Sequence, residues 1–134
     1  YNRIQTSVFS WSPDSKQIAY LSQKSGQYNI WLVNSDGSND VQLTANQDKN
    51  LYLDCPLWSP DGKTIAYSSK TATTSTEGLP SFQIRLIETE TKKSSALTQP
   101  GKFLRLIGWA QGGGELFFVN TKGSETVGLQ SEVT

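Results

Sequence analysis

Polar and aromatic side chains occur at matching distances before three tryptophans of the sequence, four and six residues upstream in each case. The residues at these positions are Gln5, Ser7, Tyr52, Asp54, Phe103 and Arg105. If the segments that end in the tryptophans are strands, two-residue alternation puts both sets on one side. Asp54 and Arg105 then present opposite charges to a polar ligand, and the two aromatic rings add apolar contact. The simpler interpretation is that these side chains only hydrate a channel or bridge neighbouring sheets.

The sequence lacks the residues and motifs of the common nucleophilic and metal-dependent catalytic sites. It contains no histidine and a single cysteine, Cys55, which excludes Ser-His-Asp and Cys-His catalysis, metal sites that need imidazole, and an intrachain disulfide. It also lacks a Gly-x-Ser-x-Gly motif, a Gly-rich phosphate loop and a Cys-x-x-Cys pair. Glu88 and Glu90 share a strand face, which a solvated surface explains. We therefore expect no catalytic residue, no metal site and no cofactor.

The charge balance argues against two classes of partner. Twelve Lys and Arg residues balance twelve Asp and Glu residues, so no strong field attracts nucleic acid or an anionic membrane. The pair Lys92 and Lys93 has no interleaved aromatic residues and is too small a basic patch for nucleic acid. No apolar run is long enough to cross a bilayer. We expect neither nucleic-acid binding nor direct membrane insertion.

An internal repeat positions the candidate residues. Residues 9–20 return without gaps as residues 56–67, and a decayed third copy covers residues 108–118. The related tryptophans Trp11, Trp58 and Trp109 are roughly 50 residues apart, which is the length of a four-stranded propeller blade. Alternation and turn residues divide the copies into short strands, without any helical periodicity. These expected strands cover about residues 5–11, 17–22, 28–33, 40–44, 51–58, 64–69, 82–88, 94–98, 103–109 and 115–120.

The predicted fold is all-β, a partial β-propeller of two to three four-stranded antiparallel blades. We expect one propeller segment over residues 1–134, with blades at about 5–44 and 51–98 and an incomplete blade at 103–134. The tryptophans are expected to pack between neighbouring blades, because a large aromatic residue at a fixed repeat position suits sheet-on-sheet packing.

The Trp-Ser-Pro-Asp-Gly-Lys element has a mechanical explanation. Pro60 restricts the backbone at the first central position of a type I turn, and Asp61 can accept hydrogen bonds from its own backbone. Gly62 is expected to adopt the left-handed conformation that closes the hairpin. Ser15 takes its place in the first copy, which costs roughly 1 kcal/mol if it is left-handed as well.

At these residues the sequence resembles the WD-like repeat of TolB-type β-propellers, which bacterial sensor, kinase-linked and peptidase-linked propellers share. The resemblance rests on the tryptophan turn, the Ile-Ala-Tyr strand, an Ile-Trp strand and a Leu-Thr strand, and it extends over residues 5 to about 120. The third copy departs from the pattern at Ala110, Gln111 and Gly112. The resemblance implies that the strand ending in tryptophan lines a central channel and that the Leu-Thr strand forms the outer edge.

Two to three blades are too few to close a ring, since propellers generally have four or more. The chain is therefore expected to be part of a longer propeller, or to be completed by other copies of itself. In either case the terminal blades must bury their apolar faces, so we expect self-association through blade faces.

The resemblance implies a non-catalytic platform that binds a protein partner or a small polar ligand within a larger bacterial protein. It also implies the envelope, periplasmic or extracellular, with the cytoplasm as the alternative. A second possibility is the gating propeller of a prolyl-oligopeptidase-like peptidase. A third is a sugar or polyuronate lyase, against which the absence of histidine argues. The loop at residues 71–81 exceeds its counterpart in the first repeat and is a further candidate surface, because insertions in repeat arrays often bind partners.

Overall fold

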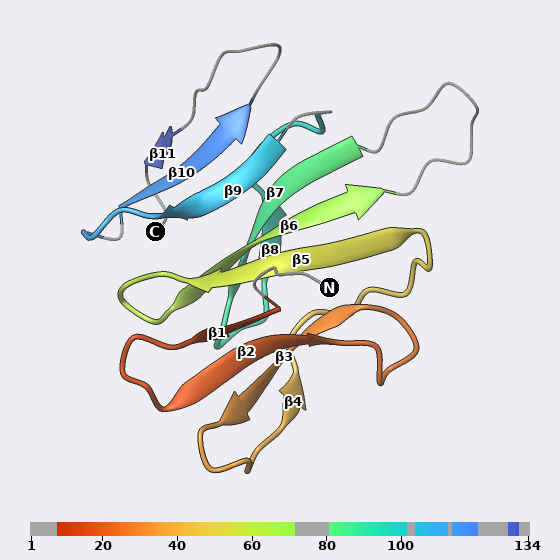
Figure 1. Cartoon of the computed structure of the whole chain (residues 1–134), viewed down its shortest axis with the longest axis vertical. Helices are drawn as coiled ribbons and strands as arrows, with labels where there is room; N and C mark the ends of the chain where they lie inside the picture. Colours follow the sequence, from red (N-terminus) through yellow and green to blue (C-terminus); the bar gives the residue numbers. More distant parts are fainter. Residues whose placement is uncertain (1–7, 72–80, 102–103, 113, 121–128, 132–134) are drawn as a thin grey trace, which may run out of the picture.

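The chain folds into three antiparallel sheets (Figure 1). This computed structural model describes residues 8–71, 81–101, 104–112, 114–120 and 129–131. The strands are β1 (Phe9–Trp11), β2 (Gln17–Ser22), β3 (Asn29–Asn34), β4 (Val41–Gln42), β5 (Leu51–Trp58), β6 (Thr64–Thr71), β7 (Ser81–Glu88), β8 (Ser94–Ala96), β9 (Leu104–Trp109), β10 (Glu115–Asn120) and β11 (Leu129–Ser131). The described residues contain no helix.

Each sheet is a meander of neighbouring strands. The first sheet has the order β1-β2-β3-β4 and the second has the order β5-β6-β7-β8. The third sheet pairs β9, β10 and β11 in the same sequence. All pairs are antiparallel. The predicted all-β partial propeller is thus confirmed.

The first hairpins of the first two sheets have the same turn. Asp61 Oδ1 accepts a hydrogen bond from the Lys63 backbone N–H at 3.0 Å, and Asp14 Oδ1 accepts one from Lys16 at the same distance. Gly62 has a φ of 75° and Ser15 a φ of 62°, so both occupy the left-handed region as expected. The turn geometry therefore survives the loss of glycine in the first copy.

The Leu-Thr motif ends the outer strand in the same way in two sheets. Leu43 and Thr44 both donate their backbone N–H to the carbonyl of Ile30, and the Ile30 N–H donates to Thr44 Oγ1 at 2.8 Å. In the second sheet the Ile84 backbone N–H donates in the same way to Thr98 Oγ1 at 3.1 Å. Because the threonine hydroxyl replaces a ladder carbonyl, regular pairing stops before the motif, and β4 and β8 are shorter than the expected strands.

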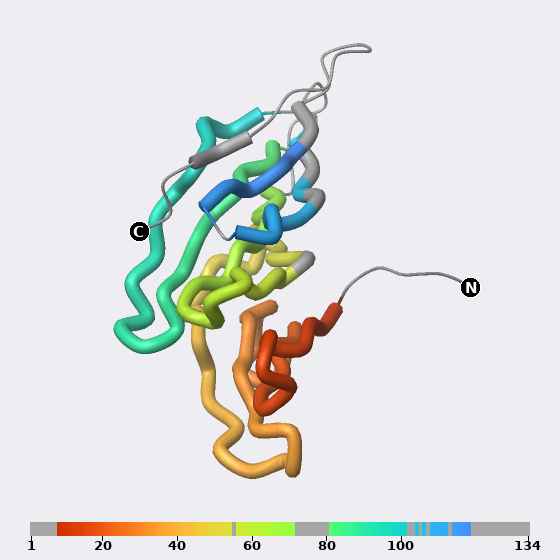
Figure 2. Tube along the Cα trace, turned by 90° about the vertical axis from the view of Figure 1, so that its left-hand side faces the viewer, coloured from red at the N-terminus to blue at the C-terminus, as the bar shows by residue number. Residues whose placement is uncertain are grey.

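The sheets are arranged as wedges. Their first strands lie close together, β1 against β5 and β5 against β9, whereas among the described strands β4 and β8 contact only their own sheets. Figure 2 shows β1 and the hairpin between β7 and β8 on opposite sides of the molecule. This arrangement agrees with inner strands gathered near one axis and outer strands spread apart.

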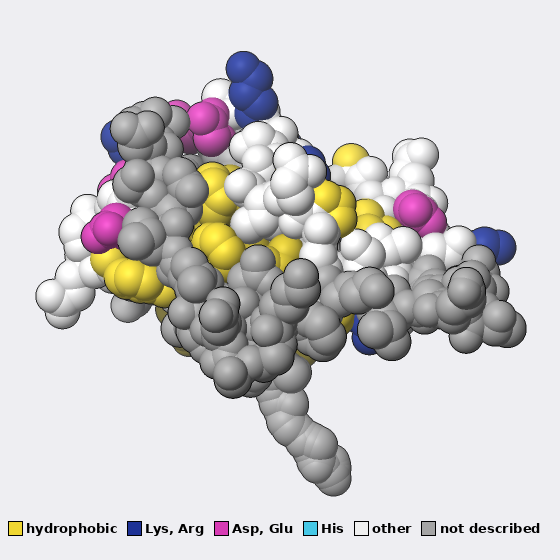
Figure 3. Space-filling view, turned by 90° about the horizontal axis from the view of Figure 1, so that it is seen from above, with side chains coloured by type: hydrophobic (Ala, Val, Ile, Leu, Met, Phe, Trp, Pro, Cys, Tyr) yellow, Lys and Arg dark blue, Asp and Glu magenta, His cyan; other side chains and the backbone are white. Residues whose placement is uncertain are grey.

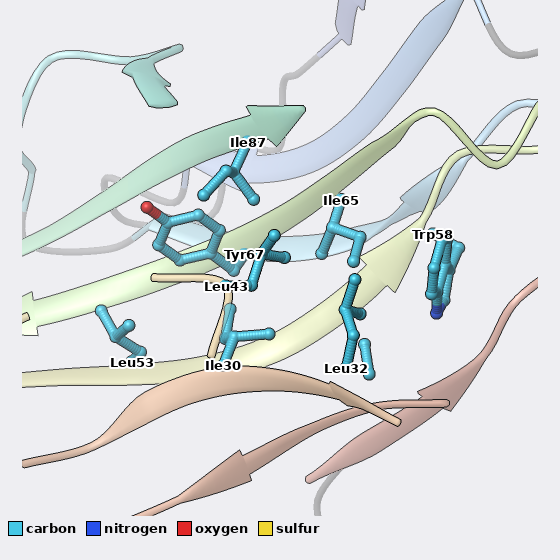
Figure 4. Packing of buried hydrophobic residues seen from close by; sticks show 9 residues of the cluster. Ile30, Leu32, Leu43, Leu53, Trp58, Ile65, Tyr67 and Ile87 are labelled. Atoms are coloured by element: carbon cyan, nitrogen blue, oxygen red, sulfur yellow. The ribbon is translucent and has the colours of Figure 1, made fainter. Parts of the chain in front are cut away.

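The main core lies between the first and second sheets (Figure 4). Alternation within β6 divides the residues between two interfaces: Ile65 and Tyr67 enter this core, and Ala66 enters the next one. The first core consists of Ala19, Ile30, Leu32, Leu43, Leu53, Trp58, Ile65, Tyr67 and Ile87. A second core joins the second and third sheets and consists of Ala66, Ile84, Leu106 and Leu116.

Two of the three repeat tryptophans pack between sheets as expected. Trp58 lies in the first core, and its indole Nε1–H donates to the Ser10 carbonyl at 2.9 Å. Trp109 packs against the second core and donates to the Leu57 carbonyl at 3.1 Å. Trp11 differs, because its side chain is 49% exposed. It lies on the face of the first sheet that is turned away from the second, where no described sheet covers it.

Candidate functional site

A cleft of about 370 Å³ opens where β5 begins and is lined by residues of the first and second sheets. Tyr28, just before β3, contributes from the first sheet, and the strands β5, β6 and β7 contribute from the second. The rings of Tyr28 and Tyr52 lie 5.8 Å apart between centroids at an interplanar angle of 60°. This tilted geometry is favourable for aromatic pairs, and it fixes one wall of the cleft.

Cross-strand pairing sets the polar groups of the cleft. Tyr52 on β5 pairs with Lys70 on β6, which in turn pairs with Phe82 on β7. One step along the strands, Asp54 pairs with Ser68, whose hydroxyl donates to the Asp54 carbonyl at 3.4 Å. Directly paired residues in antiparallel strands have adjacent side chains. The cleft therefore combines aromatic rings with a carboxylate, an ammonium group and a hydroxyl.

Tyr52 and Asp54, two of the predicted binding residues, both line this cleft. Tyr52 is 40% exposed and Asp54 is half-buried. Gln5, Ser7 and Phe103 lie outside the described residues, as does the side chain of Arg105 on β9. The expected juxtaposition of Asp54 with Arg105 therefore stays a prediction.

Seven of the nine lining residues were not anticipated from the sequence: Val8, Leu21, Tyr28, Leu53, Ser68, Lys70 and Phe82. Lys70 and Phe82 flank the long loop, whose residues 72–80 lie outside the described part of the chain. The loop was recognised in the sequence as a candidate surface. Pairing the strands on either side of it would have placed these two residues beside Tyr52, because the strand register continues to the base of the loop.

A larger groove of about 600 Å³ separates the outer strands of the first two sheets. It runs between Gln42, Thr44 and neighbouring residues on one side and Tyr67, Arg85 and Lys92 on the other. Arg85 is engaged within its own sheet, since its guanidinium donates to Gln83 Oε1 at 3.2 Å and to Ser94 Oγ at 3.3 Å. The groove is explained by the wedge arrangement, in which outer strands diverge.

A polar cluster covers the outer part of the first sheet. Lys24 Nζ lies 4.1 Å from the centroid of the Trp31 ring and pairs with Asp40, whose other carboxylate oxygen accepts a hydrogen bond from the Tyr20 hydroxyl at 2.6 Å. The hydrogen bond to Asp40 raises the pKa of Lys24, and the same bond lowers the pKa of Asp40. Burial raises the pKa of Tyr20. The charged forms of Lys24 and Asp40 are therefore favoured over their neutral forms.

None of the groups of His, Cys, Asp and Glu within the described residues is arranged to hold a metal ion. The same residues include no helix long and apolar enough to span a membrane.

Comparison with solved structures identifies the architecture. A structure of TolB from Acinetobacter baumannii aligns with a TM-score of 0.68 and 20% identity, over 95% of this chain and 32% of that one. The tricorn protease aligns at 0.65 with 13% identity, over 88% of this chain and 11% of that one. Dipeptidyl peptidase 4 from Porphyromonas gingivalis aligns at 0.64 with 13% identity, over 84% of this chain and 22% of that one.

The sequence itself matches no protein-family model and no curated protein. The chain spans about a third of the TolB structure and smaller fractions of the two peptidases. At these identities the likeness concerns the fold. Three wedge-arranged sheets, two repeated tryptophan contacts and the match to TolB together show that this chain has the fold of a TolB-type β-propeller segment.

Proposed function

We propose that this chain is a non-catalytic segment of a larger bacterial propeller protein and that it binds a protein partner through the cleft at the start of β5. The observation that carries the proposal is the composition of that cleft, which Tyr28, Tyr52 and Phe82 line together with Asp54 and Lys70. Aromatic surface with a few charged groups is typical of binding sites that accept a peptide side chain and orient its backbone.

The fitting ligand is a short extended peptide with one apolar or aromatic side chain. That side chain would enter beside the Tyr28 and Tyr52 rings, and flanking polar groups would reach Ser68 and Lys70. A small polar ligand with an apolar face fits the same chemistry. We propose the bacterial envelope as the location, because the repeat resembles that of TolB-type propellers.

The test is a titration of the labelled chain with short synthetic peptides that carry a central Trp, Phe or Leu, followed by NMR. We expect shifts at backbone amides of β5, β6 and β7 around the cleft. Tyr52→Ala should weaken binding about tenfold, since it removes one wall of the aromatic pair. Val41→Ala is the matched control, because Val41 is 43% exposed and lies outside the cleft. Equal binding by both variants would refute the site.

The second candidate function is a gating propeller of a peptidase. It is favoured by the fold likeness to the tricorn protease and to dipeptidyl peptidase 4. The neighbouring coding sequence separates the two: a downstream α/β segment with a Gly-x-Ser-x-Gly motif supports the peptidase, because the chain itself has no nucleophile motif.

A further inference from the structure

The groove of about 600 Å³ between the outer strands of the first two sheets is a second concave surface, apart from the cleft at the start of β5. We call it the outer groove; Thr44 and Asn46 line one wall, and Tyr67, Arg85 and Lys92 line the other. Figure 2 shows the hairpin between β7 and β8 beside the segment that leads out of β4. Both walls belong to adjacent described sheets, so the groove does not depend on which residues precede or follow them.

The charges of the outer groove have one sign. Among the described residues that line it, Arg85 and Lys92 are basic and none is Asp or Glu. Glu88 lies at the base of the same hairpin, but its carboxylate accepts a hydrogen bond from the Thr91 hydroxyl at 2.6 Å and does not line the groove. On the side of the molecule seen in Figure 3, by contrast, Lys and Arg side chains lie among Asp and Glu side chains. A groove lined by charges of one sign attracts a ligand of the opposite sign.

The first repeat shows how a basic side chain is neutralised at the outer strands. Lys24 forms an ion pair with Asp40, which directly precedes β4. The other carboxylate oxygen of Asp40 accepts a hydrogen bond from the Tyr20 hydroxyl at 2.6 Å. The ammonium group also lies over the Trp31 ring, 4.1 Å from its centroid. The repeat therefore supplies its own carboxylate to this cluster.

The second repeat has the basic side chain without the carboxylate. The strand register places Arg85 where the first repeat has Trp31, and Ser94 where it has Asp40. The guanidinium donates to Tyr67 Oη at 3.4 Å, to Gln83 Oε1 at 3.2 Å and to Ser94 Oγ at 3.3 Å, and all three acceptors are neutral. A guanidinium has more N–H donors than these bonds use.

No carboxylate of the described residues pairs with Arg85, although its side chain is half-buried. A partly buried charge is stabilised by an oppositely charged partner, and a guanidinium binds a carboxylate with two parallel hydrogen bonds. The outer groove therefore lacks the anion that Asp40 supplies in the first repeat.

The opposite wall of the outer groove is fixed by a buried hydrogen-bond network. Asn29 is fully buried, and its Oδ1 accepts from the Thr44 hydroxyl at 2.7 Å and from the Asn46 backbone N–H at 2.6 Å. Leu43 and Ile87, which are both buried, add apolar surface to the groove. A wall that is already ordered lowers the entropic cost of binding. The groove thus offers a positive charge, an apolar surface and a preformed shape.

We propose that the outer groove binds an extended acidic peptide segment of a protein partner. A Glu or Asp side chain of this peptide accepts hydrogen bonds from Arg85 and Lys92, in place of the carboxylate that the second repeat lacks. Neighbouring apolar side chains of the peptide contact Leu43 and Ile87. A volume of about 600 Å³ with apolar surface exceeds what a lone carboxylate fills, which favours a peptide over a small free acid. This site is separate from the cleft of the proposed function and does not depend on it.

Calorimetric titration of the full 134-residue chain with short capped peptides tests the proposal. A peptide of alternating Leu and Glu should bind at least about tenfold more tightly than the same peptide with Gln in place of Glu, because only the former supplies a carboxylate. Added salt should weaken this binding. Glutarate, a free dicarboxylate, should bind more weakly than the Glu peptide. Equal affinities of the Glu and Gln peptides, or of glutarate and the Glu peptide, would overturn the proposal, as would no binding at all.

Two adjacent lysines provide a matched pair of variants. Lys92 lines the outer groove, whereas Lys93 is exposed in the same hairpin and does not line it. Lys92→Gln should therefore raise the dissociation constant of the Glu peptide several-fold, and Lys93→Gln should leave it unchanged. Arg85→Gln should raise it at least about tenfold. Tyr52→Ala, which alters the cleft, should have no effect on this peptide. Equal effects of the two lysine substitutions would contradict the site.

Ser94→Asp gives the decisive result. It restores the carboxylate that Asp40 supplies in the first repeat, so Arg85 should pair within the chain and the Glu peptide should bind at least about tenfold more weakly. Ser94→Asn has a similar size without the charge and should bind the peptide as the original chain does. Because Ser94 is exposed on an outer strand, both variants should fold, and circular dichroism checks this. Unchanged binding by Ser94→Asp would overturn the proposal.

Discussion

Trp11 and Trp58 occupy the same position of the repeat and differ in their exposure and in their contacts with neighbouring sheets. Trp58 is 8% exposed and donates a hydrogen bond to Ser10, whereas Trp11 is 49% exposed. The twelve residues around them align without gaps. The comparison shows that a repeat residue is buried only when a neighbouring sheet supplies the other half of the interface.

The largest expected difference between the two repeats concerns these tryptophans. Trp58→Ala should lower the free energy of unfolding by about 3–5 kcal/mol, because it opens a cavity in the first core and removes the indole hydrogen bond to the Ser10 carbonyl. Trp11→Ala should lower it by less than about 1 kcal/mol at low protein concentration. Urea denaturation of both variants measures the difference, and equal losses would contradict the assignment of Trp11 to an open face.

A smaller effect is expected at the turns. Ser15→Gly should raise the free energy of unfolding by roughly 0.5–1 kcal/mol, since it relieves a left-handed serine. Gly62→Ser should lower it by about 1 kcal/mol for the converse reason. Thermal denaturation of the two single variants, and of the double variant that carries both substitutions, measures both changes. Changes of the same sign would show that the turns are not equivalent.

The pH dependence is the smallest effect and should be shared by both repeats. The Ser12 hydroxyl lowers the pKa of Asp14, and the Ser59 hydroxyl lowers the pKa of Asp61. A carboxyl whose folded pKa lies below its unfolded value contributes stability above the unfolded pKa and loses it as pH falls through the folded pKa. The melting temperature should therefore decrease as the pH is lowered below about 4.

Substituting one aspartate at a time identifies its share of this acid sensitivity. Asp14→Asn and Asp61→Asn should each flatten the curve of melting temperature against pH in the acid range. Because both carboxylates accept the same two hydrogen bonds, the two variants should behave alike. A flattened curve for only one of them would show that the turns differ in solution.

Much of the architecture could be predicted from the repeat. The spacing of Trp11, Trp58 and Trp109 indicated blade-sized units, and Pro60, Asp61 and Gly62 predicted a turn that the structure confirms. These features depend on residues close together in the chain, where proline, aspartate and glycine restrict the backbone directly.

The candidate site could be predicted only in part. Tyr52 and Asp54 were found because they repeat at a fixed distance from a tryptophan. Tyr28, Lys70 and Phe82 were missed, because they enter the cleft from outside the strands that end in the tryptophans. Their approach depends on the strand register and on the angle between two sheets, and no local pattern specifies that angle.

The amino-acid sequence by itself determined ten of the eleven described strands, the turn of the first hairpin in each of the first two sheets and the antiparallel meander of each repeat, since adjacent segments and short-range backbone preferences decide them. Only the tertiary structure decided which face of each sheet is covered, which aromatic residues meet in the cleft and which indole finds a carbonyl. The physical reason is that a side chain is buried only when two surfaces meet, so Trp11 and Trp58 differ because a sheet of the described residues covers Trp58 and none covers Trp11.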